Sequence, residues 1–112
     1  MPRDSTLTLF QGTLDMLVLK ALAAGTQHGY GITAWIRQRT KGDLEVEDGA
    51  LYQALHRLEH KGWVDAEWGL SDNNRRARFY RLTARGRREL GTTEGVWRRY
   101  ARAVFRVIDT PT

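Results

Sequence analysis

The chain has 112 residues, three histidines and no cysteine, and its length is typical of one domain with a small core. The lack of cysteine excludes disulfides, thiolate metal sites and cysteine nucleophiles, and it fits a reducing cytoplasm. The formal charge is +5, because acids and bases balance in residues 1–62 whereas residues 63–112 hold eleven arginines against six acids. The planar arginine side chain pairs with phosphate, so residues 63–112 are a candidate surface for binding a polyanion. The alternative is that this charge only keeps the protein soluble.

The first part of the chain predicts an N-terminal arm and an apolar helix. The arm, residues 1–11, lacks the apolar core of a signal peptide, and the most apolar run, Leu14 to Ala24, is too short to span a bilayer. We therefore expect a soluble cytoplasmic protein without membrane contact. The helix, Thr13 to Ala24, is apolar on two sides, so we expect a partner subunit to cover one of them. Its core face consists of Leu14, Leu17, Val18, Ala21 and Leu22, and its other side of Met16, Leu19 and Ala23.

A second helix follows a turn that contains Gly29 and Gly31, and it ends near Thr40. Its predicted inward residues are Ile32, Trp35 and Ile36. Residues 43–47 predict an extended connector with Leu44 and Val46 on one side.

The stretch from Asp48 to Gly62 predicts a short helix with two different faces. Asp48 is placed to cap its N-terminus, and Gly62 is placed to end it in a left-handed conformation. The inward stripe consists of Leu51, Ala54, Leu55 and Leu58. The outward face consists of Tyr52, Gln53, His56, Arg57 and His60, which can form hydrogen bonds and include no acid. Such a helix fits a DNA major groove, and an ordinary solvated helix is the alternative.

After Gly62 the apolar pattern changes to a period of two. Val64, Ala66 and Trp68 predict a strand with one covered face. Residues 70–74 predict a turn, and residues 75–82 return as a second strand. The tip and the returning strand carry Arg75, Arg76 and Arg78. Three helices followed by a basic hairpin predict a winged helix-turn-helix domain over residues 12–82. In such a domain the third helix reads bases, and the hairpin, called the wing, contacts the DNA backbone.

Residues 83–112 predict a C-terminal dimerisation helix and tail, so the fold class is mainly α with a small β-hairpin. Thr83 is placed to cap this helix, and its apolar residues repeat with heptad spacing. The predicted dimerisation residues are Leu90, Trp97, Tyr100, Ala101, Val104 and Ile108. The alternative is that these residues pack in the core of their own chain. Gly91 and Gly95 predict a bend or break, because each glycine costs a helix about 1 kcal/mol.

Several motifs in the chain, taken together, form a specific signature. They are Gly12-Thr-Leu-Asp15, His28-Gly-Tyr-Gly-Ile32, Gly49-Ala-Leu-Tyr-Gln-Ala-Leu-His-Arg-Leu-Glu59, Gly62, Ala66-Glu-Trp68, Asn73-Asn-Arg-Arg-Ala-Arg-Phe-Tyr80 and Leu82-Thr-Ala-Arg-Gly86. They resemble the PadR family of bacterial transcriptional regulators, in its short form with one C-terminal dimerisation helix. The resemblance implies a dimeric repressor, commonly of detoxification, efflux or stress genes, that releases DNA on binding small, often aromatic, compounds. The chain departs from the family at Ala50, where Ser or Thr is usual, and at Gln53, where Pro is usual, so its base preference is expected to differ.

We therefore predict a homodimeric repressor that binds double-stranded DNA at a palindromic operator, with half-sites about 10 bp apart or a multiple of that. The predicted DNA-binding residues are Tyr30, Gly49, Ala50, Tyr52, Gln53, His56, Arg57, Arg75, Arg76 and Arg78. A small aromatic effector is predicted at Trp97, where paired indoles could sandwich a flat molecule. Simple packing of Trp97 at the subunit interface is the alternative.

Other functions have less support in the residues. The chain has two serines, scattered histidines and no distinct acid pair, so we predict that it is not an enzyme and has no cofactor. His56 and His60 lie one helical turn apart but lack the further ligands of a metal site. The serious alternative is a winged-helix module that binds a protein without sequence-specific DNA binding, and a weak dependence of affinity on salt would distinguish it.

Overall fold

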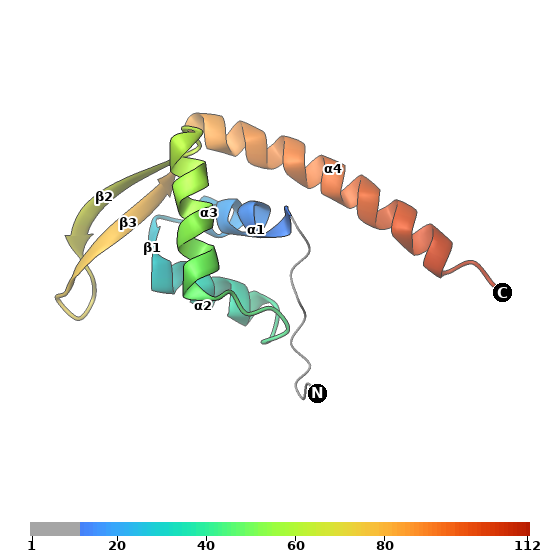
Figure 1. Ribbon diagram of the computed structural model, residues 1–112, viewed down its shortest axis with the longest axis horizontal. Coiled ribbons are helices and arrows are strands. Elements are labelled where there is room, and N and C mark those ends of the chain that lie inside the picture. The colour runs from blue at the N-terminus through green and yellow to red at the C-terminus, as the bar shows by residue number, and fades with distance from the viewer. Residues whose placement is uncertain (1–11) are drawn as a thin grey trace.

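A computed structural model describes residues 12–112, so the predicted arm at residues 1–11 lies outside the described part. The elements in chain order are α1 (Thr13–Ala23), β1 (Gln27–His28), α2 (Gly29–Arg39), α3 (Asp48–His60), β2 (Val64–Leu70), β3 (Arg76–Leu82) and α4 (Ala84–Ile108). The strands form one antiparallel sheet in the order β1-β3-β2, and the β2–β3 hairpin projects beside α3 (Figure 1). The predicted fold class, a mainly α winged helix with a C-terminal helix, is confirmed.

The core is built around α1, which packs against α2, α3, β3 and α4. Its buried residues are Val18, Leu19, Ala21 and Leu22. The prediction that Leu19 lies outside the core is wrong, because other elements of the same chain cover it. Leu14 and Leu17, which were predicted inward, are only partly buried, as is Met16. The apolar surface that α1 leaves partly uncovered therefore lies mainly in its first half, with Ala23 partly buried at the other end.

The second helix starts earlier than the glycine pattern predicted. Nδ1 of His28 accepts a hydrogen bond from the amide of Gly31 at 3.0 Å and caps α2. Gly29 and Gly31 thus lie in the first turn of the helix, and the predicted turn before it is wrong at these positions. Gln27 and His28 form β1, a strand too short for an alternating pattern to reveal. The predicted inward residues are buried or partly buried: Ile32, Trp35 and Ile36.

The third helix buries the predicted apolar stripe. Its members, each at most 1% exposed, are Leu51, Ala54, Leu55 and Leu58. Glu47 occupies the N-cap position without a capping bond from its side chain, and Asp48 is the first helical residue. The prediction of Asp48 as the cap is therefore wrong by one position, and its carboxylate lies instead in the first turn, where the helix dipole favours an acid. Gly62 follows the helix with a φ of 78°, as predicted.

The hairpin pairs in register from Val64 opposite Leu82 to Leu70 opposite Arg76. The face that carries Val64 and Leu82 is buried at the base of the hairpin. Trp68 lies on the same face but is 58% exposed. The prediction of a covered face is wrong at Trp68, because the hairpin reaches beyond the helices that cover its base (Figure 1).

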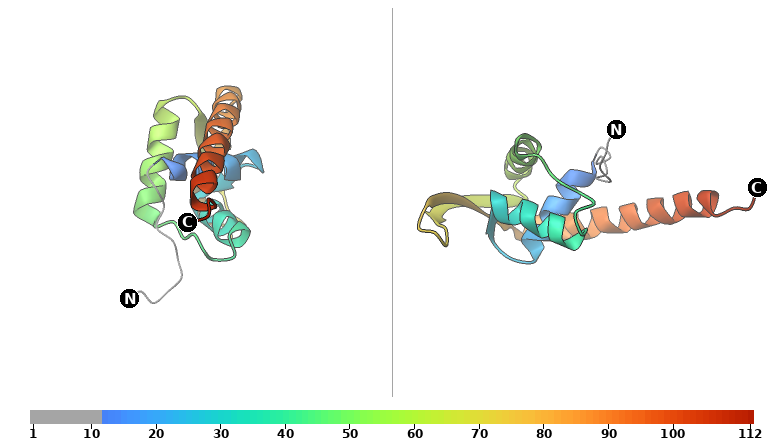
Figure 2. Two further views of the ribbon diagram at one scale, coloured as in Figure 1. Left: turned by 90° about the vertical axis from the view of Figure 1, so that its right-hand side faces the viewer. Right: turned by 90° about the horizontal axis from the view of Figure 1, so that it is seen from below.

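The last helix, α4, is one continuous helix of 25 residues that extends away from the body (Figures 1 and 2). The predicted bend or break between Gly91 and Gly95 is wrong. Contacts with α1 hold the helix across these glycines, since Leu90 is buried in the core and Glu94 pairs with Lys20 at 3.1 Å. Packing therefore outweighs the low helix propensity of glycine here.

The junction between β3 and α4 is fixed by several backbone contacts. The Thr83 hydroxyl accepts a hydrogen bond from the Gly86 amide at 3.0 Å, which confirms the predicted cap. The same hydroxyl donates to the carbonyl of Gly62 at 2.9 Å, and the Thr83 amide donates to the carbonyl of Trp63 at 3.0 Å. A Cβ at Gly86 would overlap the Trp63 carbonyl oxygen, so only glycine allows this close approach. From residue 12 onward, no helix has the length and apolar character needed to cross a membrane.

Candidate nucleic-acid interface

The outward face of α3 is uncovered and lies along one side of the molecule (Figure 2). Because its apolar stripe is buried, the intervening positions point to solvent. The exposed residues of this helix that were predicted to bind DNA are Gly49, Ala50, Tyr52, Gln53, His56 and Arg57. The tyrosine, glutamine and histidine side chains present hydrogen-bonding groups suited to base edges.

The first turn of α2 lies beside this face. A Cβ at Gly29 would come within 2.6 Å of the Tyr52 hydroxyl, so the tyrosine reaches from α3 to the start of α2. Tyr30 follows in the same turn and is 71% exposed. The structure thus brings both predicted tyrosines to one region of the surface.

Arg57 does not point freely into solvent. Its Nη2 lies 2.7 Å from Oδ1 of Asp15 on α1, and its Nε donates to Oδ2 of the same carboxylate at 3.4 Å. The hydrogen bond to Asp15 raises the pKa of Arg57 above its ordinary value. This pair joins α3 to α1, the central helix of the core.

The three predicted wing arginines have different surroundings. Arg75 lies at the hairpin tip and is exposed. Arg76 is exposed as well, with its guanidinium carbon 4.6 Å from the centre of the Trp68 ring. Arg78 reaches back to α3, where its Nη2 lies 2.9 Å from Oε2 of Glu59. The hairpin is therefore connected to α3 by this ion pair.

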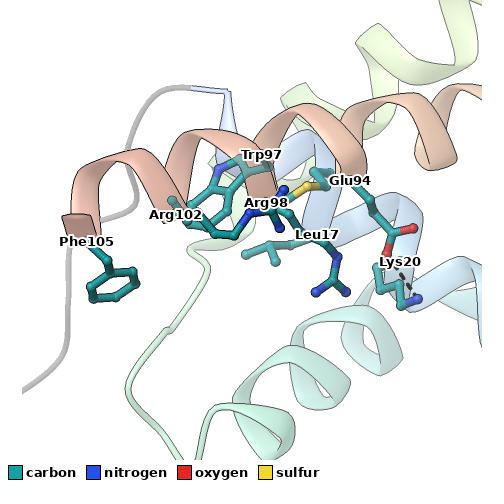
Figure 3. A pocket seen from close by; sticks show the side chains of 9 residues that line it. Leu17, Lys20, Glu94, Trp97, Arg98, Arg102 and Phe105 are labelled. Atoms are coloured by element: carbon teal, nitrogen blue, oxygen red, sulfur yellow. Dashed lines mark ion pairs between the residues drawn. The ribbon is translucent and has the colours of Figure 1, made fainter.

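A groove of about 480 Å³ runs between α1 and α4 (Figure 3). Its apolar lining includes Leu17, Trp97, Ala101 and Phe105, and its rim is charged. Trp97 also meets Tyr100 edge to face, with ring centres 6.4 Å apart. The groove places the predicted effector residue beside the exposed part of α1.

The other predicted dimerisation residues lie along α4 in two different environments. Leu90 is only 5% exposed and belongs to the core of its own chain, which leaves little of it for a second subunit. By contrast, most residues beyond the first half of α4 are exposed and many are apolar, whereas Ala101 is half-buried beside the groove. They include Val96, Trp97, Tyr100, Val104, Phe105, Val107 and Ile108.

A sequence profile of the family described as "Transcriptional regulator PadR-like family" matches residues 18–92, which is more than half of the chain. The chain belongs to this family. The predicted PadR resemblance is thereby confirmed, and DNA-binding regulation of transcription follows from family membership.

Solved structures resemble this PadR-like regulator over most of its length. One is a transcriptional regulator from Clostridium thermocellum, with 26% identity and a TM-score of 0.78, covering 86% of this chain and 93% of that one. Another is a PadR family regulator from Eggerthella lenta, with 29% identity and a TM-score of 0.75, covering 90% of this chain and 86% of that one. An uncharacterised protein from Lysinibacillus sphaericus is 30% identical over 90 residues, which are 80% of this chain and 82% of that protein.

Three features of the candidate interface were not predicted from the sequence of this PadR-like regulator: the two ion pairs made by Asp15 and Glu59, and the exposure of Trp68. Asp15 and Glu59 hold arginines that lie 42 and 19 residues away, and no local pattern reveals such pairs. Trp68 was assigned to a covered face, because alternation does not show where the hairpin leaves the body. Within residues 12–112, no group of three or more histidine or acidic side chains is arranged to hold a metal ion.

Proposed function

We propose that this PadR-like regulator is a dimeric repressor that reads a palindromic operator through α3 and holds the flanking backbone with its wing. The observation that carries the proposal is the exposed polar face of α3, with Tyr52, Gln53 and His56 uncovered, beside a hairpin with exposed arginines. Side chains on such a helix discriminate bases in the major groove, and arginines on a wing bind phosphate.

The uncovered apolar residues of α4 support dimerisation. Val107 is 76% exposed and Tyr100 is 63% exposed, although both are large apolar side chains on a well-formed helix. A monomer rarely leaves such a continuous apolar surface in water. A second copy with the same surface would cover it in a two-fold arrangement, and two-fold symmetry in the protein favours a palindrome in the DNA.

Selection of bound sequences from random duplex DNA, carried out with the purified protein at two salt concentrations, tests this function. We expect an enriched palindrome and an affinity that falls steeply with salt, because bound arginines release counterions from DNA. No enrichment, together with weak binding that salt abolishes, would favour the alternative of a module that binds a protein partner.

We further propose that the groove between α1 and α4 admits a small planar aromatic effector that contacts Trp97. The groove volume of about 480 Å³ falls in the range of small-molecule sites, and its lining is mainly apolar. Titration of planar dyes into the wild-type protein should quench tryptophan emission, and Trp97→Phe should remove that response. Equal quenching in the two proteins would assign Trp97 to packing alone.

A further inference from the structure

The two faces of the wing differ in chemistry. Cross-strand partners share one face of a sheet, so Trp68 lies with its partner Arg78, and Leu70 lies with its partner Arg76. These four residues are named here the inner wing face, because they continue the face that packs against the core at the base of the hairpin. The opposite face carries Asp65 and Glu67 on β2.

The inner wing face is held toward α3 and is partly apolar. The ion pair between Arg78 and Glu59 connects it to the C-terminal half of the reading helix. Beyond this pair, Trp68 is 58% exposed and Leu70 is 66% exposed. The Arg76 guanidinium lies over the Trp68 ring at 4.6 Å, an arrangement that joins an aromatic surface to a charge that can bind phosphate.

The rest of the described chain does not cover this surface. Figure 1 shows the hairpin and the free end of α4 at opposite ends of the molecule, so the apolar surface of α4 is separate from the inner wing face. The two faces also differ in charge, since Arg76 and Arg78 lie on the inner wing face, whereas the opposite face carries Glu67 and Asp65, with Arg81 paired to Asp65. A polyanion would therefore approach the wing from the side of α3.

We propose that Trp68 contacts operator DNA by packing its indole on the deoxyribose rings that flank the bases read by α3, while it holds Arg76 against the neighbouring phosphate. The inference rests on the proposed function and adds a contact residue to it. Deoxyribose rings are the apolar part of the duplex backbone, and sugar and phosphate contacts fix the register of a DNA-binding protein. Because the indole is uncharged, loss of its contact should change the salt dependence of the affinity less than loss of an arginine contact.

The test compares the wild type with Trp68→Ala, Trp68→Phe and Arg76→Ala on the duplex enriched by selection. Trp68→Ala should weaken binding about tenfold, because an apolar contact of this size is lost, and it should change the salt slope less than Arg76→Ala does. Arg76→Ala should reduce the salt slope by about one unit, because one phosphate contact is lost. Trp68→Phe should retain most of the affinity, since phenylalanine keeps an aromatic surface.

Fluorescence supplies a second measurement. The tryptophan emission of the wild type should change on addition of the duplex, and Trp68→Phe should remove most of that change. Trp35→Phe on α2, where the Trp35 ring is partly buried and lies 4.9 Å from the Arg39 guanidinium carbon, is the control and should leave the DNA response intact. Circular dichroism should show an unchanged fold in the Trp68 and Arg76 variants, because both side chains are exposed.

The outcomes separate this inference from the proposed function. Wild-type affinity in Trp68→Ala, with an unchanged fluorescence response in Trp68→Phe, would overturn the role of Trp68 while leaving palindrome recognition intact. A wild-type protein that enriches no duplex would overturn both and would assign the inner wing face to a protein partner.

Discussion

Two arginines that we propose to face DNA already have an anionic partner in their own chain: Arg57 pairs with Asp15, and Arg78 pairs with Glu59. Each guanidinium is about half exposed, and an exposed pair of this kind contributes at most about 1 kcal/mol to stability. DNA offers a dense row of phosphates to the same guanidinium groups. We therefore expect these carboxylates to affect DNA affinity more than folding.

Asp15→Asn tests this expectation. The variant should bind operator DNA severalfold more tightly at low salt, because Arg57 loses its competing carboxylate and a negative charge is removed near the DNA. Its free energy of unfolding should fall by less than about 1 kcal/mol. DNA titration and urea denaturation measure the two effects.

Asp65→Asn is the matched control for Asp15→Asn. Asp65 pairs with Arg81 at 3.1 Å on the wing face that points away from α3, so its removal should change operator affinity less. Weaker DNA binding by Asp15→Asn would contradict the expectation, and it would show that Asp15 orients Arg57 toward DNA.

His28 is expected to stabilise the start of α2 by capping. His28→Ala should lower the free energy of unfolding by about 1 kcal/mol, whereas His28→Asn should retain much of the stability, because asparagine is a strong N-cap residue. Both variants remove the edge-to-face contact with Phe79, so the difference between them isolates the cap. Equal losses in urea denaturation would assign the effect to the Phe79 contact instead.

At the scale of elements, periodicity predicted the helices and the hairpin because each must bury an apolar stripe. The stripe from Leu51 to Leu58 is an example, since four residues at helical spacing leave only one way to orient α3. The same reasoning failed for β1, which has two residues and exists only because β3 pairs with it from far along the chain. Residue type predicted the N-cap at Asp48, but the structure has it at Glu47. The exact end of a helix depends on the path of the preceding connector, which residue type does not show.

The arrangement of the candidate site was harder to predict than its composition. The exposure of Tyr30, Tyr52 and Gln53 could be predicted, because residue type and helical position are local properties. The pairing of Arg57 with Asp15 depends on how α1 and α3 pack, and sequence spacing carries no information on it. The exposure of Trp68 similarly depends on how far the hairpin extends beyond α3.

The glycines of α4 should respond to substitution in opposite ways. Gly91→Ala and Gly95→Ala should each stabilise the protein by up to about 1 kcal/mol, because both sites are helical and an added Cβ meets nothing within 4 Å. Gly86→Ala should destabilise it, because its Cβ would overlap the Trp63 carbonyl. Urea denaturation measures all three. Destabilisation by Gly91→Ala or Gly95→Ala would instead indicate that the glycine lies against a second chain.

At the scale of the whole molecule, operator binding is expected to depend on the dimer. Val104→Glu should shift the protein toward monomers, because it places a charge in the apolar surface of α4 that we assign to the second subunit. Operator affinity should then fall, since the two half-sites are no longer bound as a unit. Sedimentation velocity and DNA titration measure the two effects.

Arg99→Glu provides the control, because Arg99 lies on the basic side of α4, away from Val104. It should leave the dimer intact. A dimeric Val104→Glu protein with a normal circular dichroism spectrum would show that the subunits associate through another surface.

Because α4 is one long continuous helix, a small change of angle at its base moves its free end a long way. Twenty-five residues at a rise of 1.5 Å give a length of about 37 Å, so a tilt of about 10° at its base would displace the free end by about 6 Å. That is more than one base-pair step of about 3.4 Å. If a second subunit is held near the free end, the angle at the Thr83–Trp63 junction sets the distance between the two reading helices. The operator spacing that the dimer accepts would then be decided by a backbone contact that touches no base.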